Sequence, residues 1–88
     1  MRINQDFVLQ KVGNTYVAVP VGEASKHFHA MVNLNGTAAF LWTRLAEKDC
    51  TEADLTEALL AEYDVSREVA EQDVRRGIEL LQQHHILV

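Results

Sequence analysis

The stretch "FHAMVNLNGTAAFLW", residues 28–42, changes its periodicity within a single turn. Its first half alternates apolar residues with more polar or flexible ones. Because successive side chains of a strand point to opposite faces, this half predicts a β-strand over residues 28–34. Asn35 and Gly36 interrupt the alternation, and residues 37–42 are mostly good helix formers. We therefore expect a strand that leads almost directly into a helix.

Two further strands are predicted on the N-terminal side. The runs "FVLQKV" (7–12) and "YVAVPV" (16–21) are rich in β-branched and aromatic residues, and the intervening "GNT" supplies the glycine and asparagine typical of a tight turn. Pro20 has no N–H to donate to a ladder, so it should lie near a strand end or a bulge. The segment "GEASK" (22–26) then connects this hairpin to the third strand. These runs predict a three-stranded antiparallel meander.

Two amphipathic helices are predicted next. The first begins after Asn35 and places apolar residues on one stripe, at Ala38, Leu41, Trp42 and Leu45. The second opens with "TEAD" (51–54), a capping-box-like start in which the Thr51 hydroxyl accepts a hydrogen bond from a backbone N–H three residues on. Its buried positions are expected at Leu55, Leu59 and Tyr63.

The last and longest helix is predicted to begin after Ser66. Its apolar stripe includes one small residue at which a neighbouring element can approach closely, and it comprises Ala70, Val74, Gly77, Ile78 and Leu81. The final "ILV" (86–88) is expected to pack as a short tail. The predicted fold class is therefore α+β, with an N-terminal three-stranded antiparallel sheet followed by three helices in a single domain over residues 1–88.

Composition argues against several classes of function. The 88 residues include 8 basic and 13 acidic side chains, a formal net charge of −5, whereas a duplex-binding protein normally presents excess positive charge. We therefore expect no nucleic-acid partner. Cys50 has no second cysteine to pair with, the first residues lack the apolar core of a signal peptide, and no apolar run approaches the ~20 residues that span a bilayer. A cytoplasmic protein with no membrane partner is expected.

No residue pattern in the sequence predicts catalysis, a cofactor or a metal. His27 and His29 share a strand face and His84 adjoins His85, but no paired cysteines or HExxH motif supports a closed metal site. We interpret these residues as surface histidines. Cys50 is interpreted as a loop cysteine of no special reactivity. The glycines are scattered and form no phosphate-binding motif, so a protein that is not an enzyme is expected.

The edge of the third strand suggests a function. In a meander this strand has only the second strand as a partner. Between His27 and Leu34 it contains no lysine, proline or acidic residue that would discourage another strand from pairing. A loop, the C-terminal tail or a second copy of the chain in a homodimer could cover this edge. The alternative is strand addition, in which an extended peptide pairs with Phe28, His29, Ala30, Met31, Val32 and Asn33.

One flank of the last helix provides a second wall for such a peptide. This flank mixes apolar residues, one charge of each sign and a histidine, and it comprises Val69, Asp73, Arg76, Leu80 and His84. The opposite flank is wholly polar and comprises Glu71, Arg75 and Gln82. If the helix runs alongside the third strand, the first flank and the strand edge form a cleft for a peptide with alternating apolar anchors.

The chain resembles a known family over nearly its whole length. The residues that carry the resemblance are Leu34, Asn35, Thr37, Ala38, Trp42, Thr51, Leu55, "YDV" (63–65) and Asp73. In this order and spacing they are similar to the PqqD-like family of small peptide-recognition proteins. One departure is that family members often carry a glycine just before the final apolar residues, where this chain has His84 and His85.

The resemblance implies a winged helix-turn-helix-like fold and a non-catalytic role as a peptide chaperone. In this family the leader of a ribosomally made precursor peptide is added to the third strand and held against the third helix. The chaperone then presents the peptide to a modifying enzyme, commonly a radical S-adenosylmethionine enzyme. The implied partners of this chain are therefore a leader peptide and such an enzyme.

Two other classes of function stay open from the sequence. Three helices beside a small sheet also occur in winged-helix transcriptional regulators, which bind DNA through the last helix. Residues 67–79 carry three arginines against four carboxylates, which argues against phosphate binding. The other alternative is a small dimerising structural module. DNA binding that falls steeply with salt would identify the regulator.

Overall fold

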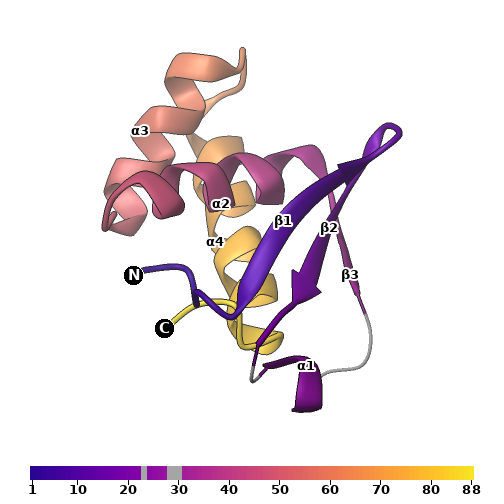
Figure 1. Cartoon of the computed structure of the whole chain (residues 1–88). Coiled ribbons are helices and arrows are strands. Elements are labelled where there is room, and N and C mark those ends of the chain that lie inside the picture. Colours follow the sequence, from indigo (N-terminus) through magenta and orange to yellow (C-terminus); the bar gives the residue numbers. More distant parts are fainter. Residues whose placement is uncertain (23, 28–30) are drawn as a thin grey trace.

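The fold consists of a small sheet on one side and three longer helices on the other (Figure 1). A computed structural model describes residues 1–22, 24–27 and 31–88. The elements follow in the order β1 (Phe7–Val12), β2 (Thr15–Pro20), α1 (Ala24–His27), β3 (Val32–Leu34), α2 (Gly36–Glu47), α3 (Glu52–Glu62) and α4 (Arg67–Gln83). The predicted α+β fold, a three-stranded antiparallel sheet followed by three helices, is confirmed. The four-residue α1 lies where the sequence predicted only a connecting segment.

The sheet is an antiparallel meander in the order β1-β2-β3. β1 pairs with β2 from Phe7 opposite Pro20 to Val12 opposite Thr15, so a two-residue turn closes the hairpin. Gly13, the first residue of this turn, has a φ of 62°, which glycine adopts without steric strain. Pro20 is the last residue of β2, as its missing N–H predicted. Because β1 and β3 each pair only with β2 among the strands that the structure describes, they form the two edges of the sheet.

The third strand is shorter than the sequence predicted. β3 spans only Val32–Leu34, and Met31, which was expected to belong to it, lies outside the strand. Residues 28–30 of the predicted strand lie outside the described residues. β3 pairs with Tyr16, Val17 and Ala18 of β2. Two residues further along, Pro20 has no N–H to donate, and β2 ends there.

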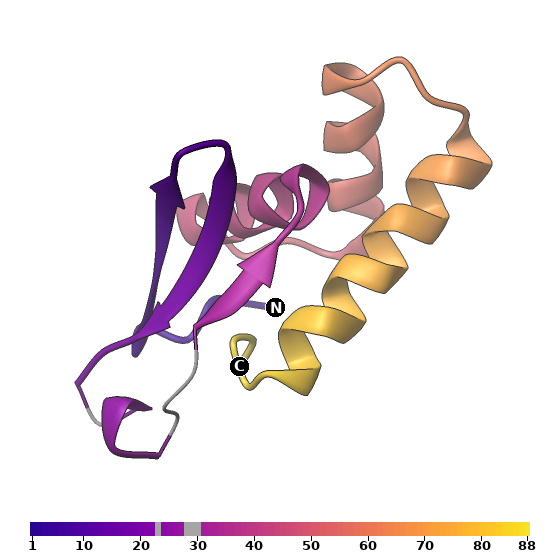
Figure 2. The same cartoon turned by 90° about the vertical axis from the view of Figure 1, so that its right-hand side faces the viewer.

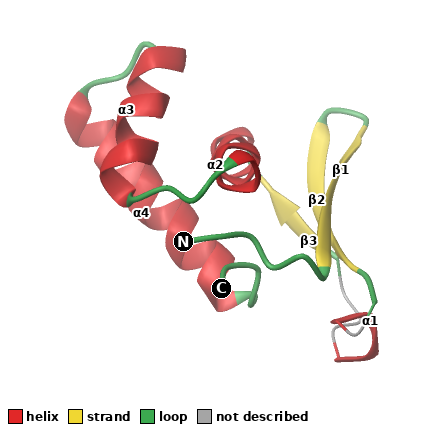
Figure 3. Ribbon diagram, turned by 60° about the vertical axis from the view of Figure 1, so that its left-hand side comes forward, coloured by secondary structure: helices red, strands yellow, loops and turns green. Residues whose placement is uncertain are grey.

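The core lies between the sheet and the helices, with α2 at its centre. Figure 3 looks nearly along α2 and shows it between the strands and the α3–α4 pair. Leu41 of α2 is fully buried and meets α4 at Gly77. A Cβ atom at Gly77 would lie 2.5 Å from Cδ1 of Leu41, so only glycine permits this close approach without a shift of the leucine. The predicted stripes of α2 and α4 are confirmed as buried.

One buried position of α3 was predicted wrongly. Leu55 and Leu59 are buried as expected, but Tyr63 is 43% exposed. The helix ends at Glu62, and Tyr63 is its C-cap with extended backbone angles, so the helical periodicity no longer places its side chain on the core face. Its ring instead meets that of Phe40 edge to face, with 5.6 Å between centroids. Thr56 is buried on α3, where its hydroxyl donates to the Glu52 carbonyl.

The C-terminal tail packs through its first two residues. Ile86 is fully buried, Leu87 forms a bridge with Ile3, and Val88 is exposed, so the expected packing of "ILV" holds only for its first two residues. His85 reaches this arrangement with a φ of 61°. The two ends of the chain lie close together (Figure 1). None of the described helices is long and apolar enough to cross a membrane.

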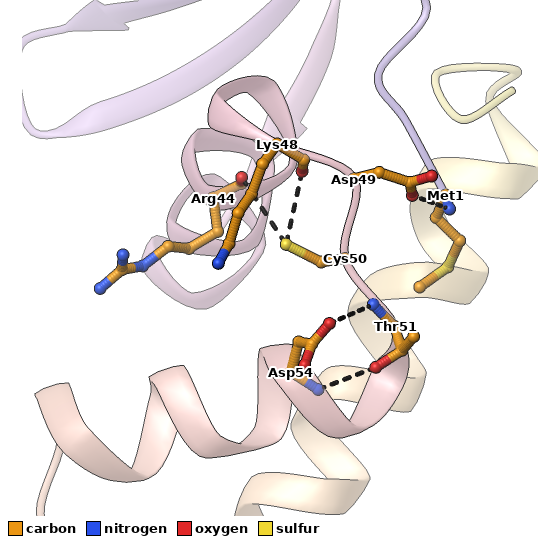
Figure 4. Close-up of polar contacts among 7 residues, drawn as sticks. All are labelled: Met1, Arg44, Lys48, Asp49, Cys50, Thr51 and Asp54. Carbon is orange, nitrogen blue, oxygen red and sulfur yellow. Dashed lines mark hydrogen bonds and ion pairs between the residues drawn. The ribbon is translucent and has the colours of Figure 1, made fainter.

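The start of α3 carries the predicted capping box in full. The Thr51 hydroxyl accepts from the Asp54 N–H at 3.1 Å, and the Asp54 carboxylate accepts from the Thr51 N–H at 3.0 Å (Figure 4). The backbone N–H of Thr51, and then its side chain, hold the pKa of Asp54 below its ordinary value of 3.8. The ionised carboxylate therefore favours the folded state.

This cap makes a prediction about acid stability. Because folding lowers the pKa of Asp54, its contribution is present above a pH of about 3.8 and is lost as the pH falls through the folded-state pKa. We expect Asp54→Ala to lower the melting temperature at neutral pH, and we expect the difference from wild type to shrink as the pH falls below about 3.8. Melting curves over a pH series measure this. A difference that stays constant into acid would show that the carboxylate charge plays no part.

Candidate functional site

The free edge of β3 is the first component of the candidate site. β2 is the only strand that pairs with β3 in the described sheet, so one side of Val32–Leu34 presents backbone groups without a ladder partner. Leu34 is buried and Val32 is half-buried, while Asn33 points to the exposed side. Met31, just before the strand, is 63% exposed. The edge is therefore accessible, although shorter than predicted, and Phe28, His29 and Ala30 lie outside the described residues.

The predicted flank of α4 is the second component. Its five residues differ in exposure. Val69 and Arg76 are exposed, whereas Asp73, Leu80 and His84 are half-buried. Leu80 also packs against the core, so its side chain is held in place. His84 is the C-cap of α4 and no longer part of the helix.

A cavity of about 270 Å³ joins these two components. On one side it is lined by the residues that follow β3 directly, Asn35, Thr37 and Ala38. On the other side it is lined by residues of α4, Asp73, Arg76, Gly77 and Leu80. Figure 2 shows how this arises, because β3 leads into the start of α2 and α4 passes beside that junction. The structure therefore brings together three of the five predicted flank residues and leaves Val69 and His84 outside this cavity.

Four residues that line the cavity were not among the predicted contacts, and two of them, Asn35 and Thr37, have polar side chains. Asn35 and Thr37 line it because the N-terminus of α2 faces α4. The Asn35 side chain caps α2 by accepting from the Ala38 N–H at 2.8 Å, which fixes its position. The signal in the sequence was present, since Asn35 ends the strand and begins the helix. Periodicity alone does not indicate which helix flank that junction faces.

The cavity offers both apolar contact and charge. Leu80 supplies apolar surface, while Asp73 and Arg76 lie one helical turn apart on α4. Within the described ranges neither Asp73 nor Arg76 forms an ion pair. Their donors and acceptors are thus available to a ligand. The arrangement can hold an extended polypeptide through backbone pairing, one apolar anchor and charged contacts.

The other polar residues weighed from the sequence form no site. Among the described residues no group of three histidine, cysteine or acidic side chains could hold a metal ion, and His29 lies outside them. Cys50 follows α2 in a loop, as predicted, but it is buried. Its Sγ lies 3.4 Å from the Lys48 carbonyl (Figure 4). Burial keeps this thiol away from solutes, which agrees with its interpretation as an unreactive cysteine.

Comparison with known proteins identifies the family. A family model described as coenzyme PQQ synthesis protein D (PqqD) matches residues 12–87. The chain belongs to the PqqD family. The matched range of this PqqD-family chain includes β2, β3, all the helices and every residue of the cavity. No curated protein matches the chain.

Two solved structures share the fold of this PqqD-family chain. One is TbiB1 in complex with the TbiA(beta) leader peptide, with a TM-score of 0.74 and 22% identity over 99% of this chain and 94% of the other. The second is a lasso peptide synthetase B1 complexed with the leader peptide, with a TM-score of 0.74 and 23% identity over 99% of this chain and 95% of the other. At this identity the similarity establishes the common fold.

Proposed function

We propose that this PqqD-family chain binds the leader of a ribosomally made precursor peptide and acts as a non-catalytic chaperone. The observation that carries the proposal is the cavity that joins the end of β3 to the α4 flank, beside a strand edge with no ladder partner. The family membership supports it, as do two proteins of the same fold that are described as complexes with leader peptides.

In this proposal the leader is added as a fourth strand at the β3 edge. The described strand is only three residues long, so backbone pairing supplies few hydrogen bonds. Side-chain contacts must then contribute much of the affinity and the specificity. Leu80 would receive an apolar side chain, and Asp73 and Arg76 would pair with a basic and an acidic residue of the leader. Residues 28–31, Val69 and His84 would extend the contact beyond the cavity.

The bound peptide would be handed to a modifying enzyme. A chaperone that holds the leader by one sheet edge leaves the rest of the precursor free to enter an active site elsewhere. We propose a radical S-adenosylmethionine enzyme as this partner, because the chain belongs to a family named for coenzyme PQQ synthesis. The proposed setting is the cytoplasm, where precursor peptides are made.

Amide hydrogen exchange tests the strand-addition model. The probe is the leader of a short precursor encoded beside this chain. On binding, the amides of Val32–Leu34 should exchange more slowly, because new ladder hydrogen bonds and burial protect them. The amides of β1, at the opposite edge, should change little. Equal protection of both strands, or none at either, would contradict strand addition at β3.

The winged-helix regulator is not favoured. α4, the helix that would read DNA, carries Arg67, Arg75 and Arg76 against four carboxylates, and Arg67 already pairs with Glu57 at 2.9 Å. DNA affinity depends on neutralising phosphates, which this surface does poorly. Titration with duplex DNA at low salt is a simple check. We expect no binding under conditions in which the leader binds.

A further inference from the structure

A second cavity, of about 600 Å³, lies at the opposite edge of the sheet from the proposed leader site. Its walls come from the N-terminal segment, the first half of β1 and the C-terminal half of α2. Its apolar lining includes Phe7, Val8, Trp42 and Leu45. This volume lies within the range of about 300–1,000 Å³ that is typical of ligand pockets. Since β1 and β3 are separate edges, the two cavities do not share a strand.

Trp42 provides the second observation. Its side chain is only 5% exposed, and it lines this cavity. The structure shows no acceptor for its indole N–H within the described ranges. Every side-chain nitrogen and oxygen atom that is fully buried in these ranges has a hydrogen-bond partner. Because the indole nitrogen has none, it is not fully buried and touches solvent. Trp42 therefore lines the cavity with a side chain whose N–H has no protein acceptor in the described ranges. A tryptophan so deeply buried normally has a partner for its N–H.

The acidic and the basic side chains that line the cavity differ in their ion pairs. Both carboxylates that line it are already paired, Glu47 with Arg44 at 3.9 Å and Asp49 with the Met1 amino group at 2.5 Å (Figure 4). That amino group lowers the pKa of Asp49, which keeps the carboxylate ionised. The two lining cations, Arg2 and Lys48, form no ion pair within the described ranges, although Arg2 also lowers the pKa of Asp49 and Lys48 that of Asp54. Together with the Met1 amino group, these cations outnumber the two lining carboxylates, so an incoming segment would meet a net positive charge, although the whole chain has a net charge of −5.

We propose that this cavity and the β1 edge dock an extended, acidic segment of a partner protein that inserts one aromatic side chain. The aromatic ring fills the apolar space over Trp42, a backbone carbonyl of the segment accepts from the indole N–H, and its carboxylates face Arg2 and Lys48. As an edge strand, β1 has alternate backbone groups that point away from β2 and can pair with the segment. The site is distinct from the proposed leader site, so both can be occupied at once.

The single tryptophan of the chain makes the test direct. The probe is the capped heptapeptide Glu-Glu-Val-Phe-Val-Glu-Glu, titrated into ¹⁵N-labelled protein. We expect the indole cross-peak of Trp42 and the amide peaks of Val8 and Leu9 to move together. Replacing the phenylalanine of the probe by alanine should weaken binding at least about tenfold, because the buried ring is lost. Replacing its glutamates by lysines should abolish binding.

Matched variants locate the site. Ala46 is exposed on α2 and lines the cavity, so Ala46→Glu should keep the fold and weaken the probe at least about tenfold by adding a like charge. Ala61→Glu makes the same change at an exposed position of α3 outside the cavity and should bind as wild type. Peaks that move at β3 and α4 instead would overturn the proposal. So would equal binding of the alanine probe, or indole shifts that follow protein concentration alone, which would indicate a second copy in the cavity.

Discussion

Replacing Trp42 by alanine should destabilise the protein by about 3 to 5 kcal/mol. The side chain is 5% exposed and belongs to the central cluster that joins the sheet to the helices. Its removal leaves an unfilled space beside an existing cavity and removes the contacts that the indole makes in the core. A typical domain has a total stability of about 5 to 15 kcal/mol, so this one change removes a large share. Denaturant unfolding, followed by circular dichroism, measures the loss.

Tyr63→Ala is the matched control for this stability prediction. It also removes an aromatic ring, but Tyr63 is 43% exposed and contacts mainly the ring of Phe40. We expect a cost below about 1.5 kcal/mol. If Trp42→Ala cost less than about 1 kcal/mol, or no more than Tyr63→Ala, the tryptophan would not be a core residue. Trp42 would then have to be reconsidered as an exposed residue that contacts a partner.

Leu80→Glu should lower the affinity for the leader peptide at least about tenfold. Leu80 supplies the apolar surface of the cavity between the end of β3 and α4. A carboxylate there must lose water before an apolar anchor can enter, which costs binding free energy. The side chain is only half-buried, so the domain should still fold with a lower melting temperature. Dissociation constants measured by titration, alongside melting curves, give both quantities.

Two charge reversals on α4 complete this experiment. Arg76→Glu changes an exposed residue of the same cavity and should also weaken binding of the leader. This variant keeps the test possible if Leu80→Glu fails to fold. Arg75→Glu makes the same reversal on the polar flank, where Arg75 lines a different cavity with Glu71 and Glu57, and should bind within about twofold of wild type. The opposite pattern, with Arg75→Glu impaired and Arg76→Glu normal, would refute the proposed groove.

The local patterns of the sequence predicted most of the fold. Runs of β-branched and aromatic residues indicated the first two strands, alternation at period two indicated the third, and the stripe of Ala38, Leu41, Trp42 and Leu45 indicated the buried face of α2. Capping residues such as Thr51 and Ser66 located the helix starts, because their side chains satisfy free backbone N–H groups. These predictions succeeded because they depend on neighbours within one or two turns. The prediction that Tyr63 is buried was wrong because it also relied on local periodicity, which did not show that α3 ends at Glu62.

The sequence by itself determined the three strands, the three longer helices and their order. Only the tertiary structure decided which of the predicted contact residues meet. The close approach of Gly77 to Leu41 sets the position of α4 against α2, and that position brings Asp73, Arg76 and Leu80 to the junction after β3. The same packing leaves Val69 and His84 outside this cavity, whereas the second cavity beside Trp42 lies where the N-terminal segment and β1 meet α2. Such contacts join residues far apart in the chain, so they follow from how whole helices pack and not from local periodicity.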